Sequence, residues 1–199
     1  MSNLKIGVDK NQLSKGSHEI MHLRFHNALV DHGFDLVPLP IPVGDYILVD
    51  DKLDEIIKRR GDRLSKIDLI GRINVSVDTK NSPQELYGDI VGPGHSRFSD
   101  SLLRAHDNGI KLYIVTENVE GITEINDFWK WRNERGWKSY WSRKRTAERE
   151  GERIPKPPQG AAQLIKAMHT MEARYGCEFI FCSQQELPKT VIRLLTEAV

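Results

Sequence analysis

The stretch Asn74-Val75-Ser76-Val77-Asp78-Thr79-Lys80 joins a β-branched run to an acid and a lysine two positions apart. Such a run predicts a strand, and the side chains of a strand alternate between its two faces. Val75 and Val77 should therefore share one face. Asp78 and Lys80 should share the other, while Thr79 points away from them.

A second acid stands in Val43-Gly44-Asp45-Tyr46, where a glycine turn opens an apolar run. If Asp45, Asp78 and Lys80 converge, the two carboxylates could hold a hard cation such as Mg²⁺ or Mn²⁺, which prefer oxygen ligands. The lysine could then orient a water or stabilise developing negative charge. From the spacing alone, an exposed Asp–Lys pair at a strand end is the alternative, because so short a pattern is common by chance.

Length and composition place the chain among globular proteins. Its 199 residues suit one domain, and 39% hydrophobic with 29% charged residues is too apolar for a disordered chain. The net charge of +1 confines any nucleic-acid footprint to local patches. We find no secretory signal and no run long enough to cross a bilayer. We therefore expect a cytoplasmic protein with no membrane partner.

Apolar runs alternate with helical patterns along most of the chain. This alternation predicts an α/β fold in which helices flank a mixed central sheet. The strands are expected over residues 4–8, 34–39, 43–49, 71–80, 110–116 and 177–182.

The composition changes in an insertion that we place at about residues 127–159. It holds all four tryptophans of the chain, which are Trp129, Trp131, Trp137 and Trp141. It also holds a basic cluster: Lys130, Arg132, Arg135, Lys138, Arg143, Lys144 and Arg145. One interpretation is a helical arm whose tryptophans pack on the core. The other is a DNA contact in which the basic side chains meet phosphates and the aromatic rings stack on unpaired bases.

The order of the motifs resembles the XPF-type nuclease domain, a branch of the PD-(D/E)XK superfamily, and in particular short stand-alone members from bacteriophages and mobile elements. The motifs are Val8-Asp9, Val43-Gly44-Asp45-Tyr46, Val77-Asp78-Thr79-Lys80, His95-Ser96-Arg97-Phe98 and a buried strand ending in Glu117-Asn118. The resemblance runs from Ile6 to Leu195, the insertion excepted. It implies a restriction-endonuclease-like fold and one nuclease domain over residues 1–199.

The resemblance also implies an activity, namely hydrolysis of DNA phosphodiesters by a Mg²⁺- or Mn²⁺-dependent endonuclease. Relatives cut flaps, forks or junctions, so specificity for one of these DNA structures is a further expectation. Carried over by position, the catalytic residues are Asp45, Asp78, Lys80 and Arg97. The metal ligands are Asp45, Asp78 and the Thr79 carbonyl, with Asp9 further out. Thr79 stands where many relatives have arginine, and Gln12 replaces a family glutamate. The family acid downstream of the lysine falls near Gln84 and Glu85.

Two other functions remain open from the sequence. The changes at Gln12 and Thr79 would also fit a catalytically inactive nuclease fold that serves as a DNA-binding or assembly module. A small-ligand α/β protein is disfavoured because no glycine-rich phosphate loop follows the first strand, and we expect no organic cofactor. We expect DNA as the partner, and the last helix could support a homodimer.

Overall fold

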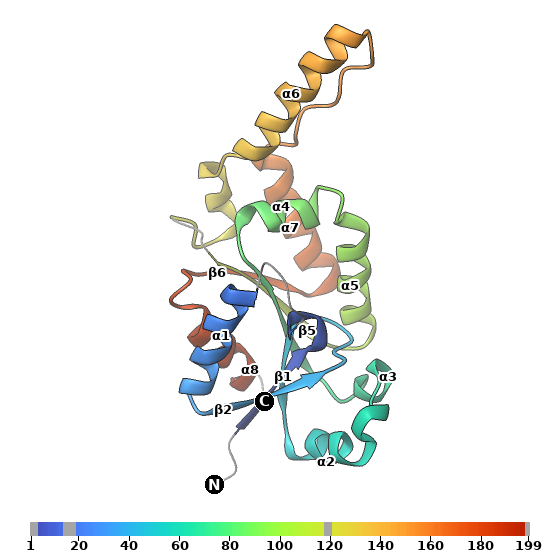
Figure 1. The fold of residues 1–199 in the computed structure, drawn as a ribbon, viewed down its shortest axis with the longest axis vertical. Helices are drawn as coiled ribbons and strands as arrows, with labels where there is room; N and C mark the ends of the chain where they lie inside the picture. The colour runs from blue at the N-terminus through green and yellow to red at the C-terminus, as the bar shows by residue number, and fades with distance from the viewer. Residues whose placement is uncertain (1–3, 14–18, 118–120, 198–199) are drawn as a thin grey trace.

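A six-stranded mixed sheet forms the centre of the computed structural model, which describes residues 4–13, 19–117 and 121–197 (Figure 1). The strands are β1 (Leu4–Asp9), β2 (Phe34–Leu39), β3 (Tyr46–Val49), β4 (Val75–Lys80), β5 (Lys111–Thr116) and β6 (Glu178–Phe181). Their spatial order is β2-β1-β3-β4-β5-β6. β3 runs antiparallel to both of its neighbours, and β4, β5 and β6 are parallel. The α/β fold with a mixed sheet is therefore confirmed.

Helices cover both faces of the sheet. One face packs against α1 (Glu19–Asp31) and α8 (Leu187–Thr196). The other packs against α2 (Asp51–Arg60), α3 (Lys66–Leu69), α4 (Pro83–Ile90), α5 (His95–Asp107) and α7 (Ala161–Tyr175). The described residues also form three short 3₁₀ helices: η1 (Lys10–Leu13), η2 (Gly61–Arg63) and η3 (Ile125–Lys130). None of the helices described is long and apolar enough to cross a membrane.

The helix α6 (Glu134–Glu150) projects from the rest of the molecule, and the chain returns beside it as an extended segment (Figure 1). The Asn133 side chain caps its start by accepting a hydrogen bond from the Gly136 N–H at 2.8 Å. Gly151 ends it in a left-handed conformation, which favours glycine. Only Tyr140 and Ala147 of its 17 residues are buried. Residues 134–159, which we refer to as the arm, fall within the predicted insertion.

Two strands, β3 and β4, begin three and four residues later than predicted, whereas β5 and β6 begin one residue later. β3 starts at Tyr46 instead of residue 43, because Gly44 adopts a positive φ of 74° and bends the chain. β4 starts at Val75 instead of residue 71, because Gly71, at φ 73°, forms a turn after the unpredicted helix α3. In both cases the acid of interest keeps its place at the end of the sheet where β4 and β5 terminate.

Candidate active site

The bend at Gly44 places Asp45 against β4. A Cβ on Gly44 would lie 2.3 Å from Ser76 Oγ and 3.0 Å from the Val77 carbonyl oxygen, so no larger residue fits there. Ser76 is fully buried and donates its hydroxyl proton to the Val43 carbonyl at 2.7 Å. The Asp45 N–H donates to the Val77 carbonyl at 2.8 Å. The turn and the strand therefore fix one another.

Three donors hold the Asp45 carboxylate. The Thr79 N–H and hydroxyl both donate to Oδ2, at 2.8 and 2.9 Å. The Gln12 side-chain amide donates to Oδ1 at 2.6 Å. Thr79 does point away from Asp78 and Lys80, as strand alternation predicts, but this direction brings its hydroxyl to Asp45. Gln12, which stands where the resemblance predicts a glutamate, reaches the same carboxylate from η1.

Lys80 bridges two carboxylates beside Asp45. Its ammonium lies 3.0 Å from Asp78 Oδ2 and 3.0 Å from Asp89 Oδ2, and all three side chains are at most 13% exposed. Lys80 and Asp78 share the sheet face that packs against α5, where the ammonium also lies 5.4 Å from the centre of the Phe98 ring. Asp78 and Lys80 thus form a buried pair, which argues against the exposed pair that the spacing alone allowed.

Burial and neighbouring charges shift the pKa values of this pair. Burial raises the pKa of Asp78, the Lys80 ammonium lowers it, and the nearby Asp45 carboxylate raises it again, to about 7. Burial alone would lower the pKa of Lys80, but Asp78, Asp45 and Asp89 outweigh it and raise that pKa well above its usual range. Lys80 is therefore a permanent cation, whereas Asp78 exchanges its proton near neutral pH. Perturbed groups of this kind in a cleft are typical of functional sites.

These residues lie in an open cleft of about 430 Å³, which we refer to as the acid cleft. Asp9 is buried and lines it, as do Glu85 and Arg97. Arg97 is 88% exposed in its side chain and lies 3.8 Å from Asp89. Glu85 serves as part of the helix cap, since its carboxylate accepts a hydrogen bond from the Asn81 N–H at 2.9 Å. The structure thus brings every predicted catalytic residue and metal ligand to one cleft.

The donor set limits the kind of metal ion that fits. Among the described residues, no group of three or more His, Cys, Asp or Glu side chains is placed to hold one, so Asp9 does not complete a three-acid cage with Asp45 and Asp78. The Asp45 carboxylate does lie close enough to raise the pKa of Asp78. Two carboxylates and one carbonyl suit Mg²⁺, which usually keeps several waters and takes one or two carboxylates from the protein.

The tryptophans of the insertion divide between packing and exposure. Trp131 packs on Tyr87 and Phe128, with ring centres 5.6 and 6.1 Å apart. Trp137 and Trp141 lie one turn apart on α6 and stack on each other at 6.2 Å, yet they are 41% and 47% exposed. Trp129 is also exposed. Packing on the core therefore accounts for Trp131 but for none of the other three.

The predicted basic cluster lies on the surface of the same region. Lys144 is half-buried over the Trp141 ring at 5.1 Å and lies 3.6 Å from Glu148. Lys130 is paired with Asp127. The other members are exposed and form no ion pair with any described residue: Arg132, Arg135, Lys138, Arg143 and Arg145.

The sequence analysis did not predict the contacts of two residues in the acid cleft. Asp89, not Gln84 or Glu85, is the downstream acid that contacts Lys80. The sequence feature that points to Asp89 is its place on the helix that follows β4, one residue before the buried Ile90. Gln12 was noted only as a departure from the family pattern. Its contact with Asp45 depends on η1, for which the sequence contains no clear signal.

Comparison with known proteins gives relatives by structure only. No protein-family model matches the sequence, and no curated protein does. The chain is similar in structure to XPF from Aeropyrum pernix, with a TM-score of 0.54, 15% identity, and coverage of 98% of this chain and 64% of that chain. XPF from the same organism in complex with DNA gives a TM-score of 0.52 with the same identity and coverage. The chain thus has an XPF-like fold and spans about 64% of the length of these neighbours.

Proposed function

We propose that the chain is a metal-dependent DNA endonuclease. The observation that carries the proposal is the meeting of Asp45, Asp78 and the buried Lys80 beside the end of β4, where two carboxylates and a cation line one open cleft. The XPF-like fold adds support, since one of the similar structures is a complex with DNA.

The proposed role of each residue follows from its chemistry. Asp45, Asp78 and the Thr79 carbonyl would hold Mg²⁺ or Mn²⁺, and Asp9 would act from further out. A cation bound there would polarise a phosphoryl oxygen and lower the pKa of a bound water. Gln12 and Thr79 orient the Asp45 carboxylate through three hydrogen bonds.

Lys80 and Arg97 supply positive charge toward the phosphate. Lys80 stays protonated beside Asp78 and can stabilise negative charge that develops during hydrolysis. Arg97 is exposed at the mouth of the cleft, where it can leave Asp89 and contact the scissile phosphate. A contact of 3.8 Å between an exposed guanidinium and a carboxylate is weak, so this exchange costs little.

The arm is proposed as a second DNA contact. Its exposed arginines can neutralise phosphates, and Trp137 with Trp141 offers a stacking surface for unpaired bases. If Arg143 and Arg145 each contact a phosphate, changing either to glutamine should reduce the slope of log affinity against log salt by about one. Arg63→Gln, on η2 at the opposite end of the molecule (Figure 1), is the control. Unchanged slopes for both arm variants would exclude phosphate contacts at these positions.

The test of the activity is cleavage of labelled linear, flap, fork and four-way-junction DNA with Mg²⁺ or Mn²⁺. Asp78→Asn should reduce the rate by more than about 100-fold. Asp107→Asn, which changes an exposed acid at the end of α5, should not. Equal cleavage by Asp78→Asn and the wild type would refute the site assignment.

The alternative function makes a different prediction in the same assay. A catalytically inactive DNA-binding or assembly module would bind these DNAs and leave them intact with either metal. The contact of Lys80 with both Asp78 and Asp89 is the observation that favours it, because an ammonium held in this way competes with a cation for Asp78. Retained binding with no cleavage by the wild type would select this function.

A further inference from the structure

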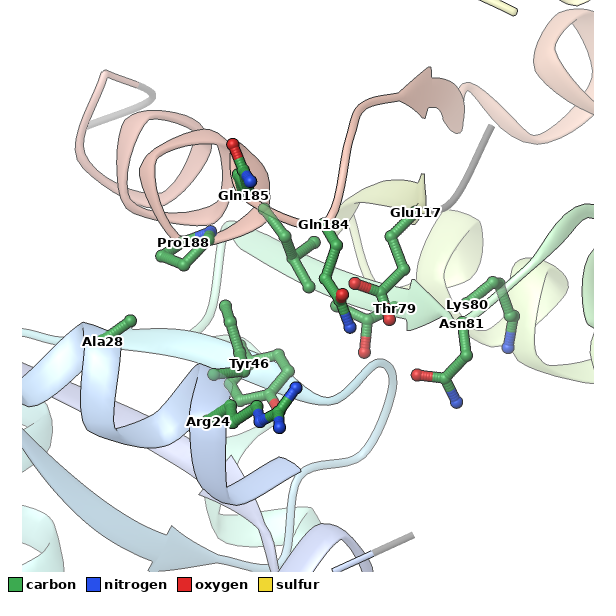
Figure 2. Close-up of a pocket in the computed structure, with 12 residues that line it drawn as sticks. Arg24, Ala28, Tyr46, Thr79, Lys80, Asn81, Glu117, Gln184, Gln185 and Pro188 are labelled. Carbon is green, nitrogen blue, oxygen red and sulfur yellow. The ribbon is translucent and has the colours of Figure 1, made fainter. Parts of the chain in front are cut away.

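A second cavity, of about 340 Å³, opens beside the end of β4 (Figure 2). We refer to it as the α1–α8 cavity, because these two helices supply its outer walls. Arg24 and Phe25 come from α1, Tyr46 from β3, and Leu187 from α8. Thr79 and Lys80 line both this cavity and the acid cleft, so the two cavities meet at the end of β4.

Glu117 is the unusual residue of this cavity. It follows β5 directly and is only 4% exposed. Figure 2 shows its carboxylate directed into the cavity beside Gln184 and Thr79. Its backbone N–H donates to the Lys80 carbonyl at 2.9 Å, yet its carboxylate has neither a hydrogen-bond nor an ion-pair partner among the residues that the structure describes.

The Glu117 carboxylate oxygens are open to the cavity, since the fully enclosed side-chain atoms without a hydrogen-bond partner among the described residues are Thr116 Oγ1 and Asn133 Nδ2. Burial raises the pKa of Glu117, and the Glu85 charge raises it further. A ligand in the cavity that donates hydrogen bonds can therefore reach this carboxylate directly.

The opposite wall is aromatic and apolar. Phe25 and Tyr46 meet edge to face, with ring centres 5.0 Å apart, and both are buried. The Tyr46 hydroxyl is held by His26 at 3.1 Å, so the ring has a fixed position. Leu187 adds aliphatic surface. A flat, largely apolar group with hydrogen-bond donors along one edge therefore matches the walls of the cavity.

We propose that the α1–α8 cavity binds one unpaired guanine base of the DNA substrate, with Glu117 accepting hydrogen bonds from its Watson–Crick edge. This inference rests on the proposed function and specifies its substrate. The volume is at the lower end of small-ligand pockets, which span roughly 300–1,000 Å³, so a single base fits and a base pair does not. Proteins that read an extruded base combine apolar contacts to its face with hydrogen bonds to this edge.

The chemistry of the carboxylate favours guanine over the other bases. Guanine presents two neighbouring N–H donors, N1–H and the 2-amino group, to the two oxygens of Glu117. Adenine and cytosine present one amino donor beside a ring acceptor, and that acceptor would face a carboxylate. Because the two cavities share the end of β4, a strand with a phosphate in the acid cleft can direct an adjacent base into the α1–α8 cavity.

The test measures binding of short labelled oligothymidylates by fluorescence anisotropy in EDTA, where metal-dependent cleavage does not occur. A single dG in the oligomer should raise affinity by about tenfold over hypoxanthine, which lacks the 2-amino group, since a hydrogen bond to a charged group is lost. This comparison uses the wild-type protein and does not depend on the folding of a variant. Glu117→Gln should abolish the preference, whereas the control Glu178→Gln, an exposed change on β6, should keep it.

Three results would overturn the inference. Equal affinity for dG and hypoxanthine would do so, and so would a dG preference that survives in Glu117→Gln. Equal affinity for free GMP and for the dG oligomer would show that the cavity takes a free nucleotide instead of a DNA base. The cleavage assay with Mg²⁺ is separate: loss of base preference with cleavage intact overturns only this inference, and base preference without cleavage overturns only the nuclease assignment.

Discussion

Replacing Lys80 by methionine tests the electrostatics of the site without any substrate. Methionine fills a similar volume but removes the ammonium that lies 3.0 Å from both Asp78 and Asp89. Two carboxylates that are each 13% exposed would then lack their partner. Breaking a buried ion pair in this way costs about 3–5 kcal/mol, so we expect a loss of this size in the free energy of unfolding at pH 8.

The loss of unfolding free energy in the Lys80→Met variant should be smaller at lower pH. The folded-state pKa of Asp78 is about 7 with Lys80 present, and removing the ammonium raises it further. A group whose pKa is higher in the folded state than in the unfolded state loses stability as the pH rises through the folded value. For each pH unit over which the folded variant holds one more proton than the folded wild type, the variant recovers about 1.4 kcal/mol of stability. We therefore expect the loss at pH 6 to be smaller than the loss at pH 8, by up to about 1.4 kcal/mol from Asp78.

The assay is urea unfolding followed by far-UV circular dichroism, because the exposed tryptophans of the arm make fluorescence a poor reporter of the core. Lys58→Met is the matched control, since Lys58 pairs with Asp54 at 2.7 Å but is 70% exposed. It should cause a much smaller loss that is the same at both pH values. A loss for Lys80→Met that does not depend on pH, or that is no larger than the control's, would refute the reasoning.

Three further predictions concern the acid cleft. Asp78 must lose its proton to bind a cation, and its pKa is about 7. Mn²⁺ affinity measured by calorimetry should therefore be about tenfold higher at pH 8 than at pH 6. Equal affinities at the two pH values would exclude Asp78 as a ligand. Gly44→Ala should cost about 1–3 kcal/mol more in urea unfolding than Gly151→Ala, because both have a positive φ but only Gly44 has no room for a Cβ. Gln12→Glu would place a third carboxylate beside Asp45 and Asp78. The melting temperature of this variant should be lower than that of the wild type in EDTA and should rise more steeply with added Mg²⁺. The same Mg²⁺ response in both proteins would contradict this prediction.

Local signals predicted much of the fold. The strand at residues 34–39 has the predicted bounds, because an apolar run stands between Gly33, which turns the chain at φ 87°, and the prolines that follow. The helix α2 also has local signals at both ends, since the Asp50 carboxylate caps it and Gly61 ends it. The helix α3 was missed because its four residues are too few to show a helical period.

The site was predictable only where it depends on one strand or one turn. Asp78 and Lys80 pair because strand alternation places them on one face, which the sequence shows directly. Asp89 joins them only because α4 packs back toward β4, and Gln12 reaches Asp45 across 33 positions of the chain. Such contacts depend on tertiary packing, which no local pattern encodes. The exposure of Trp137 and Trp141 was undetermined for the same reason.

The shallow burial of the arm has a consequence for its local stability. A helix with two buried residues among 17 gains little from packing, so its amide protons should exchange with solvent far faster than those of the central strands. The arm should therefore open and close many times for each global unfolding event, and a protease should cut it while the sheet stays folded. Because the sheet and the acid cleft do not depend on this segment for their core, its sequence and length can change without loss of the fold.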